Sequence, residues 1–220
     1  MEKIISCSIL NVDFLKLNDI LKELHENKIP WLHFDVMDGN FVKNLSFGNS
    51  ILKSINDSEY KFFNDVHLMI NDPLQYYLDF IEAGASMITF HIESYNFDFE
   101  KNLKLINLIK SHNVKVGISL KPKTNISEVF KYLKYVDLVL IMSVEPGFGG
   151  QKFIEETYQK IKELKSEINK ENLNVLISVD GGINDTNAKK VREYGADVLV
   201  SGSYLLADIK DRKTKLWLLI

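Results

Sequence analysis

The run Ile4-Ile-Ser-Cys-Ser-Ile-Leu10 leads directly into Asn11-Val-Asp13, and this junction separates the two architectures that the rest of the chain allows. The apolar, β-branched run predicts a buried strand. An open doubly wound sheet is expected to carry a glycine-rich fingerprint after its first strand, whereas Asn11-Val-Asp13 contains no glycine. The sequence therefore favours the closed alternative, a barrel of parallel strands.

Strand-like and helix-like segments alternate along the whole chain. The predicted strands are Ile4–Leu10, Trp31–Met37, Phe62–Met69, Ser86–Ile92, Val114–Leu120, Val136–Met142, Val175–Asp180 and Asp197–Ser201. Between them the apolar residues recur at helical spacing, as in residues 14–24 and 154–168. Dividing 220 residues by eight strands gives about 27 per unit, the size of one βα step in a TIM barrel. The pattern predicts the α/β class, with a single (β/α)8 TIM barrel as one domain over residues 1–220.

Local signals mark several helix ends. Asp13, Asp72 and Asp185 stand where helices should begin, because an aspartate side chain can accept hydrogen bonds from the first free backbone N–H groups. Gly84 and Gly195 stand where helices should end in a left-handed residue.

Composition and charge indicate a globular protein of the cytoplasm. Hydrophobic residues make up 45% and charged residues 26%, which allows a substantial core. The net charge of −3, without a long run of one sign, gives no reason to expect nucleic acid or a membrane as partner. The one cysteine, Cys7, fits a buried strand position and a reducing compartment. No signal peptide is expected, because residues 1–5 run directly into the first strand, and the apolar residues 216–220 are too few to span a bilayer. They are expected to form a last helix that docks on the barrel or on another subunit.

Histidines and aspartates cluster at the carboxyl ends of predicted strands, where TIM barrels carry their active sites. His33 and Asp35 share one face of the second strand because they are two residues apart. His67 lies near the end of the third strand, and Asp180 ends the seventh. Two imidazoles and two carboxylates form a plausible site for one divalent first-row ion, with zinc the first choice and iron, manganese or cobalt as alternatives.

The remaining histidines are assigned other roles. His91 and Glu93 end the fourth strand at the same spacing. They could form a competing metal pair, but hydrogen-bonded support or rim structure is the preferred interpretation, because no further ligand group accompanies them. His25 and His112 lie in helical stretches and are expected to face solvent.

Glycines follow the last three predicted strands. Gly147, Gly149 and Gly150 follow the sixth, Gly181 and Gly182 the seventh, and Gly202 with Ser203 the eighth. Glycine lets backbone N–H groups approach an anion closely, and the late βα loops of TIM barrels often bind phosphate. These loops therefore predict a phosphate site, and the loop around Gly147 to Gly150 is long enough to act as a lid.

The chain resembles the ribulose-phosphate 3-epimerase family over essentially its full length. The matching segments are Ser8–Phe14, His33–Val42, Asp65–Met69, Phe90–Glu93, Met142–Phe153, Val179–Ile183 and Gly202–Ser203. The resemblance implies a TIM barrel of the ribulose-phosphate-binding type that interconverts D-ribulose 5-phosphate and D-xylulose 5-phosphate. It also implies one divalent metal per subunit and a homo-oligomer, either a dimer or a hexamer.

The resemblance also implies roles for particular residues. The metal ligands would be His33, Asp35, His67 and Asp180. Asp35 and Asp180 would exchange the roles of acid and base through an enediolate. The substrate and phosphate contacts would be Ser8, His67, Gly147, Phe148, Gly149, Gly150, Asp180, Gly181, Gly182, Gly202 and Ser203. Met37, Met69 and Met142 are expected to line the pocket and exclude water.

Two alternatives remain open. The chain could be a 3-epimerase of a ketohexose 6-phosphate, since the same catalytic set would serve that reaction. It could also be a non-catalytic phosphosugar-binding barrel. Lys43 and Lys123 depart from the family pattern, where proline and glycine are usual, but neither departure removes a metal ligand or a catalytic carboxylate.

Overall fold

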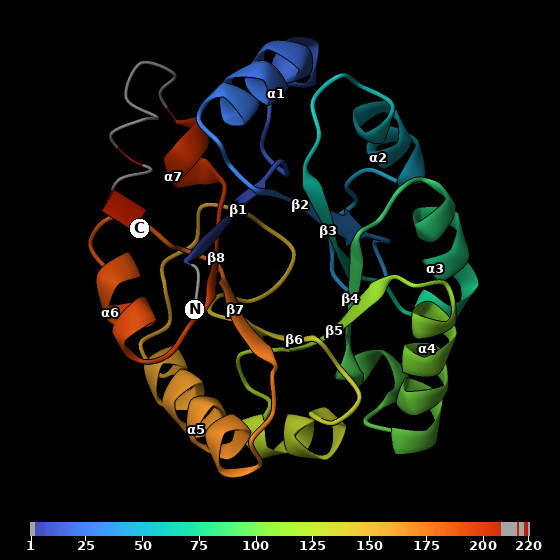
Figure 1. The fold of residues 1–220 in the computed structure, drawn as a ribbon, viewed down its shortest axis with the longest axis vertical. Helices are drawn as coiled ribbons and strands as arrows, with labels where there is room; N and C mark the ends of the chain where they lie inside the picture. The colour runs from blue at the N-terminus through green and yellow to red at the C-terminus, as the bar shows by residue number, and fades with distance from the viewer. Residues whose placement is uncertain (1–2, 208–214, 216–217, 220) are drawn as a thin grey trace.

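Eight parallel strands close into a barrel in a computed structural model that describes residues 3–207, 215 and 218–219 (Figure 1). Each strand pairs with the next, and β1 pairs with β8. The strands are β1 (Ile4–Ser8), β2 (Trp31–Met37), β3 (Phe63–Met69), β4 (Met87–His91), β5 (Lys115–Leu120), β6 (Leu138–Met142), β7 (Leu176–Asp180) and β8 (Val198–Ser201). The eight strands predicted from the sequence are confirmed: β2 has the predicted bounds, and the ends of the other strands differ by at most two residues.

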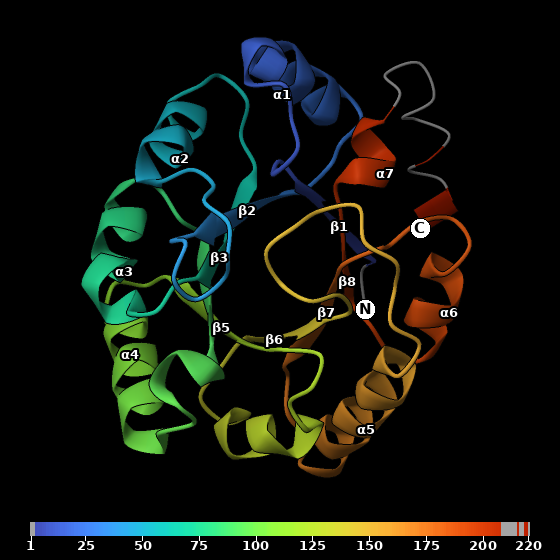
Figure 2. The ribbon, with the colours of Figure 1, turned by 180° about the vertical axis from the view of Figure 1, so that it is seen from behind.

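Helices surround the barrel and cover the outer faces of the strands (Figures 1 and 2). The α-helices are α1 (Leu17–Glu26), α2 (Asn49–Asn56), α3 (Pro73–Glu82), α4 (Phe99–Ser111), α5 (Thr157–Lys170), α6 (Ala188–Glu193) and α7 (Ser203–Leu206). Short 3-10 helices are η1 (Phe14–Lys16), η2 (Ile92–Tyr95) and η3 (Ile126–Tyr132). The connection between β5 and β6 is therefore a 3-10 helix rather than the α-helix typical of this fold. The predicted TIM barrel is confirmed.

Some helix ends differ from the sequence prediction. Asp13 caps as expected, since its carboxylate accepts the N–H of Leu15. Asp72 occupies the cap position of α3, but its carboxylate accepts a hydrogen bond from the Tyr95 hydroxyl instead. The prediction for Asp185 is wrong, because α6 begins three residues later, behind Asn187.

The other end signals are confirmed or untested. Gly84 and Gly195 follow α3 and α6 with φ of +103° and +121°, as predicted. The last helix expected at residues 216–220 lies mostly outside the described residues. Within the part of the chain that the structure describes, no helix combines the length and hydrophobicity needed to cross a bilayer.

Residues that alternate along the strands form two cores. The outward-facing set, such as Leu32, Phe34 and Ile88, packs against the helices in the larger core. At the amino-terminal end of the barrel, the inward-facing residues form an apolar layer, in which the rings of Trp31 and Phe63 stack with their centroids 4.2 Å apart. Above that layer, the inner residues of β1 to β4 become polar toward the carboxyl ends, whereas those of β6 and β8 stay apolar. This change places the buried polar groups at the mouth of the barrel.

The opposite, amino-terminal end of the barrel is held by a repeated contact. The residue just before β4, β6 and β8 accepts a hydrogen bond from the backbone N–H of the second residue in the preceding strand. The acceptors are Ser86, Asp137 and Asp197, and the donors are the N–H groups of Asn64, Val116 and Ile177, at 3.0, 2.9 and 2.9 Å. Because these contacts recur every second strand, they stabilise pairs of βα units.

Asp197 makes the most extensive of these contacts. Its buried carboxylate also lies 3.2 Å from Lys165 Nζ, and its backbone oxygen accepts from Arg192, whose other terminal nitrogen donates to the Ile4 oxygen at 2.8 Å. The Asp197→Ala variant should therefore lose about 1 to 3 kcal/mol of unfolding free energy in urea denaturation, because a buried backbone N–H and the partly buried Lys165 ammonium lose their partner.

The control for this variant is Asp57→Ala, which removes an ion pair between Asp57 and Lys53. Their side chains are 58% and 64% exposed, respectively. That pair should contribute about 0 to 1 kcal/mol. Equal losses in the two variants would contradict the importance assigned to Asp197.

Candidate active site

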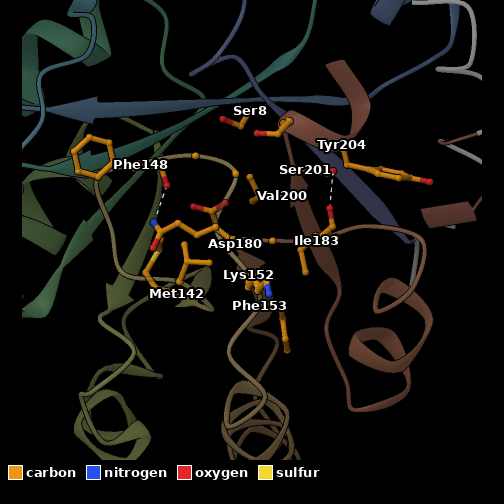
Figure 3. Close-up of a pocket in the computed structure, with 18 of the residues that line it drawn as sticks. Ser8, Met142, Phe148, Lys152, Phe153, Asp180, Ile183, Val200, Ser201 and Tyr204 are labelled. Atoms are coloured by element: carbon orange, nitrogen blue, oxygen red, sulfur yellow. Dashed lines mark hydrogen bonds between the residues drawn. The ribbon is translucent and has the colours of Figure 1, made fainter. Parts of the chain in front are cut away.

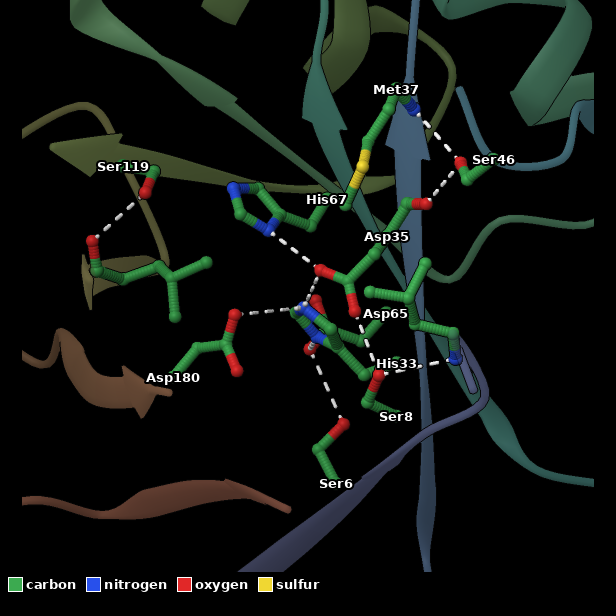
Figure 4. Close-up of polar contacts among 12 residues, drawn as sticks. Ser6, Ser8, His33, Asp35, Met37, Ser46, Asp65, His67, Ser119 and Asp180 are labelled. Carbon is green, nitrogen blue, oxygen red and sulfur yellow. Dashed lines mark hydrogen bonds and ion pairs between the residues drawn. The ribbon is translucent and has the colours of Figure 1, made fainter. Parts of the chain in front are cut away.

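Four predicted ligands converge at the mouth of the barrel (Figure 4). One ligand atom from each of His33, Asp35, His67 and Asp180 lies within 4.8 Å of the others. Strand register explains the convergence, because β2 and β3 pair so that Asp35 lies opposite His67. Both histidines are fully buried, and Asp35 is 4% exposed. The group can therefore hold one metal ion.

Asp35 lies at the centre of the group. Its Oδ2 accepts a hydrogen bond from Ser8 Oγ at 2.7 Å, and its Oδ1 lies 3.2 Å from His67 Nδ1. The same Oδ1 lies 3.3 Å from His33 Nε2, and Asp180 Oδ2 lies 4.0 Å from that nitrogen. Side chains from the three neighbouring strands β1, β2 and β3 thus surround the Asp35 carboxylate, and Asp180 approaches it from the other side of the barrel.

Each ligand histidine has one nitrogen turned to the group and one held elsewhere. His33 Nδ1 lies 2.7 Å from Asp65 Oδ2. His67 Nε2 lies 2.9 Å from His91 Nε2. The nitrogens left for an ion are therefore His33 Nε2 and His67 Nδ1.

An unpartnered atom supports a cation in this place. His33 Nε2 is buried and has no hydrogen-bond partner among the residues that the structure describes, although a buried polar atom is normally paired. It faces the oxygens of Asp35 and Asp180. Two imidazole nitrogens and two carboxylate oxygens form the kind of ligand set that binds zinc and other first-row ions. The residues present therefore fit a divalent ion.

The two aspartates titrate in opposite directions. Burial opposes the ionisation of Asp35, but the nearby His33 ring and the hydrogen bond from His67 outweigh it and hold the pKa of Asp35 far below its usual value. Burial raises the pKa of Asp180 to about 7, and the charge of Asp35 adds to the shift. One carboxyl group is therefore ionised while the other is poised to carry a proton.

The two ligand histidines also differ. Burial works against a charge on His33, but Asp35 and Asp65 outweigh it and raise its pKa well above the usual value. Burial lowers the pKa of His67 to about 4 despite its contact with Asp35. His67 is therefore neutral, which a nitrogen ligand requires, whereas His33 must lose a proton before it can bind an ion.

The ligand group borders a cavity of about 720 Å³, within the range of small-molecule sites. Figure 3 shows Asp180 in this cavity together with Ser8 and Val200. The cavity brings together nearly all residues that the sequence singled out: Ser8, Asp35, Met37, Met69, Met142, Gly147, Phe148, Gly149, Gly150, Asp180, Gly181, Gly182, Gly202 and Ser203. His33 and His67 are absent from the lining because they lie beneath its surface, fully buried.

Two glycines of the lining leave no room for a side chain. Gly182 has φ of +64°, and a Cβ there would lie 2.6 Å from the backbone nitrogen of Phe153. A Cβ on Gly202 would lie 3.0 Å from the backbone oxygen of Ser8. Because no side chain covers these positions, the backbone N–H groups of the loops after β7 and β8 are accessible at the cavity wall, as an anion site requires.

A long loop between β6 and α5, residues 143–156, crosses in front of the strands in Figure 2. Asn44 Nδ2 donates to the Gly147 oxygen at 2.7 Å, and Gln151 Nε2 donates to the Phe148 oxygen at 2.8 Å. The side chain of Phe148 is largely exposed. The loop therefore covers the cavity and is tied to the loop after β2.

Several residues of the site were not singled out from the sequence. Asp65 accepts a hydrogen bond from His33, and Ser46 Oγ donates to the backbone oxygen of Asp35 at 2.5 Å. Asn11 Nδ2 donates to Ser203 Oγ at 3.3 Å. Asp65 could have been found, because it lies two residues before His67 on the same strand face. Asn11 and Ser46 lie outside the strands, where no periodicity marks them.

The remaining histidines agree with their interpretation. His25 and His112 are exposed, as predicted. His91 is fully buried and lies outside the ligand group, but it contacts His67. Burial lowers the pKa of His91 despite its hydrogen bond to Glu93.

Solved structures share the architecture at low sequence identity. A 3-hexulose-6-phosphate synthase from Salmonella typhimurium superimposes with a TM-score of 0.72 at 15% identity, covering 98% of this chain and 96% of that one. A 3-keto-L-gulonate-6-phosphate decarboxylase from Vibrio cholerae gives a TM-score of 0.72 at 8% identity, covering 100% and 96%. At these identities the similarity concerns the fold alone.

Sequence comparison is more specific. A sequence model of the ribulose-phosphate 3 epimerase family matches residues 4–206. A ribulose-phosphate 3-epimerase of Treponema pallidum is 41% identical over 196 residues, covering 89% of this chain and 88% of the relative. A chloroplastic ribulose-5-phosphate-3-epimerase of Arabidopsis thaliana is 43% identical over 206 residues, covering 91% and 70%. With this match over nearly its whole length and a buried metal-capable group at the barrel mouth, the chain belongs to the ribulose-phosphate 3-epimerase family of enzymes.

Proposed function

We propose that this enzyme interconverts D-ribulose 5-phosphate and D-xylulose 5-phosphate, with Asp35 and Asp180 as the paired acid and base. One observation carries the proposal: the group that can hold a metal ion and the glycine loops suited to a phosphate border the same cavity of about 720 Å³. A ketose phosphate needs both features at opposite ends of one site.

Epimerisation beside a ketone removes a proton from C3 and returns one to the opposite face. The difficulty is the negative charge that develops on the ketone oxygen in the enediolate. A divalent ion held by His33, Asp35, His67 and Asp180 would supply Lewis-acid stabilisation of that charge. The two aspartates reach the cavity from β2 and β7, which are not neighbours in the barrel, so each can serve one face of a flat intermediate.

The protonation states of the two aspartates suit these roles. Asp35, ionised because of its neighbours, accepts the C3 proton in one direction. Asp180 supplies a proton to the other face. The ion would hold it ionised at rest, but the burial that raises its pKa toward neutrality keeps the protonated form accessible during turnover. The roles exchange in the reverse direction. Ser8 Oγ donates to Asp35 Oδ2 and so orients the carboxylate.

The remaining cavity residues bind and shield the substrate. Backbone N–H groups at Gly181, Gly182, Gly202 and Ser203 would hold the phosphate. Met37, Met69 and Met142 are buried around the ligand group. Their apolar side chains would exclude water and so protect the enediolate from loss of phosphate.

Three further points stay predictions: zinc as the ion, a cytoplasmic location, and assembly as a dimer or hexamer. Metal analysis of the purified protein and light scattering test the first and third. The alternative substrate, a ketohexose 6-phosphate, is tested by assaying both phosphates side by side.

Replacing either carboxyl group should stop the reaction. Asp35→Asn and Asp180→Asn should each lower turnover by about 100-fold or more, because an amide cannot transfer the proton. Exchange of the C3 proton in deuterated water, followed by NMR, measures each half of the reaction. The control is Asp79→Asn on the exposed face of α3, which should retain full activity. Near-normal turnover by Asp180→Asn would rule out the two-aspartate assignment.

Metal binding should release protons in a way that depends on pH. Because the pKa of Asp180 is raised to about 7, this group is mostly protonated at pH 6 and must lose its proton to bind an ion. At pH 8 it is already ionised. Calorimetry of Zn²⁺ binding in buffers of different ionisation enthalpy should therefore show greater proton release at pH 6 than at pH 8. Asp180→Asn should lack this difference, and an unchanged difference in the variant would contradict the assignment.

A side chain at Gly182 should weaken phosphate recognition. Gly182→Ala would force the loop to move, since its Cβ would meet the backbone of Phe153. Losing one hydrogen bond to a charged phosphate should raise the KM for the ketose phosphate about tenfold, with Zn²⁺ affinity unchanged. Gly48→Ala is the control, because no atom of the described part of the chain lies within 4 Å of its Cβ position. An unchanged KM in Gly182→Ala would place the phosphate elsewhere.

A further inference from the structure

A line of buried polar groups continues from the ligand group into the wall of the barrel. His67 Nε2 lies 2.9 Å from His91 Nε2 on β4, and His91 Nδ1 lies 3.2 Å from Glu93 Oε2 on η2. His67 and His91 are fully buried, and the Glu93 side chain is 11% exposed. None of the roles proposed above uses His91 or Glu93.

Glu93 is itself fixed at the end of this line. Its Oε1 accepts the backbone N–H of Lys121 at 2.7 Å and the Thr124 hydroxyl at 2.5 Å. Burial opposes its charge, but contacts with His91 and Thr124 outweigh burial and lower the pKa of Glu93 to about 2. Glu93 is therefore an ionised acceptor on both oxygens.

The line is covered on its outer side. The Phe41 ring lies 4.8 Å from the His91 ring, centroid to centroid. Lys121 Nζ lies 3.8 Å from the centroid of Phe41. Solvent therefore has little access to His91, and its hydrogen bonds must be made within the protein.

The order of donors and acceptors follows from the two ends. A neutral histidine carries one ring proton. If His67 Nδ1 binds an ion, its proton must be on Nε2, which then donates to His91 Nε2. His91 must accept there, so its own proton is on Nδ1 and is donated to Glu93. In this arrangement each ring N–H has a hydrogen-bond acceptor. If the His91 proton were on Nε2 instead, the N–H groups of His67 and His91 would face each other.

We propose that His91 and Glu93 are positioning residues that hold His67 in the tautomer whose Nδ1 lone pair faces the metal. This inference rests on the proposed function in that it requires the ion between His67 and its partners. His33 is held directly by Asp65, whereas His67 is held by a carboxylate acting through a second imidazole. Partners of this kind orient a ligand histidine and raise its basicity.

The test removes the charge while keeping the shape. In Glu93→Gln the amide must either turn its NH2 toward the Lys121 N–H or turn it toward the His91 Nδ1–H, and a donor meets a donor in both cases. Zn²⁺ affinity, measured by competition with a chromophoric chelator, should fall about 10- to 100-fold. His91→Phe keeps a ring in place but leaves the His67 Nε2–H without an acceptor, and it should weaken binding in the same direction.

Thr124→Val is the matched control. It loosens the same loop by removing the hydroxyl that donates to Glu93, but it keeps the charge and the contact with His91. Its Zn²⁺ affinity should stay close to that of the unaltered protein. The second readout is long-range ¹H–¹⁵N NMR of the Zn²⁺-loaded protein, which should place the His91 proton on Nδ1 and the His67 proton on Nε2.

The outcomes separate this inference from the proposed function. If the unaltered protein binds Zn²⁺ and epimerises while Glu93→Gln and His91→Phe keep its affinity, this inference alone is wrong. It is also wrong if Thr124→Val weakens binding as much as Glu93→Gln, or if the His91 proton lies on Nε2. Failure of the unaltered protein to bind any divalent ion would overturn both proposals.

Discussion

Asp35 sits at the meeting point of three strands, and the rest of the mouth is arranged around its charge. A buried carboxylate is stable only when hydrogen bonds and positive partners replace the water it has lost. Ser8 on β1 and His67 on β3 supply hydrogen bonds, and His33 lies beside it on β2. The registers that pair β1 with β2 and β2 with β3 are therefore functional constraints, because a slip of one residue would turn these side chains out of the barrel.

The inside of the barrel has two chemically different halves. Strands β1 to β4 line it with serine, histidine and aspartate, whereas β6 and β8 line it with aliphatic residues such as Leu140 and Val200. Asp180 enters from the apolar half with few partners, and Asp35 belongs to the polar half. This contrast explains why two residues of one type have pKa shifts of opposite sign.

The sequence was sufficient for the strands, for the four converging side chains and for the glycine loops, because alternation along a strand specifies which residues share its inner face. It was insufficient for contacts between strands. The bonds of Asp65 to His33 and of His91 to His67 depend on register between neighbours, which no single strand encodes. Helix α6 begins behind Asn187 rather than at Asp185, in the polar run Asn184–Asn187, where the sequence offers several residues of the type that caps helices.

The pairing of β1 with β8 has a consequence for synthesis on the ribosome. Ile4 lies beside Val198, so β1 must wait for β8 to be synthesised before both of its edges are paired. Until then the nascent chain carries two open strand edges, a template for association with other chains. The ring of hydrogen bonds can close only after β8 has left the exit tunnel, which makes closure a late, long-range event in the folding of the barrel.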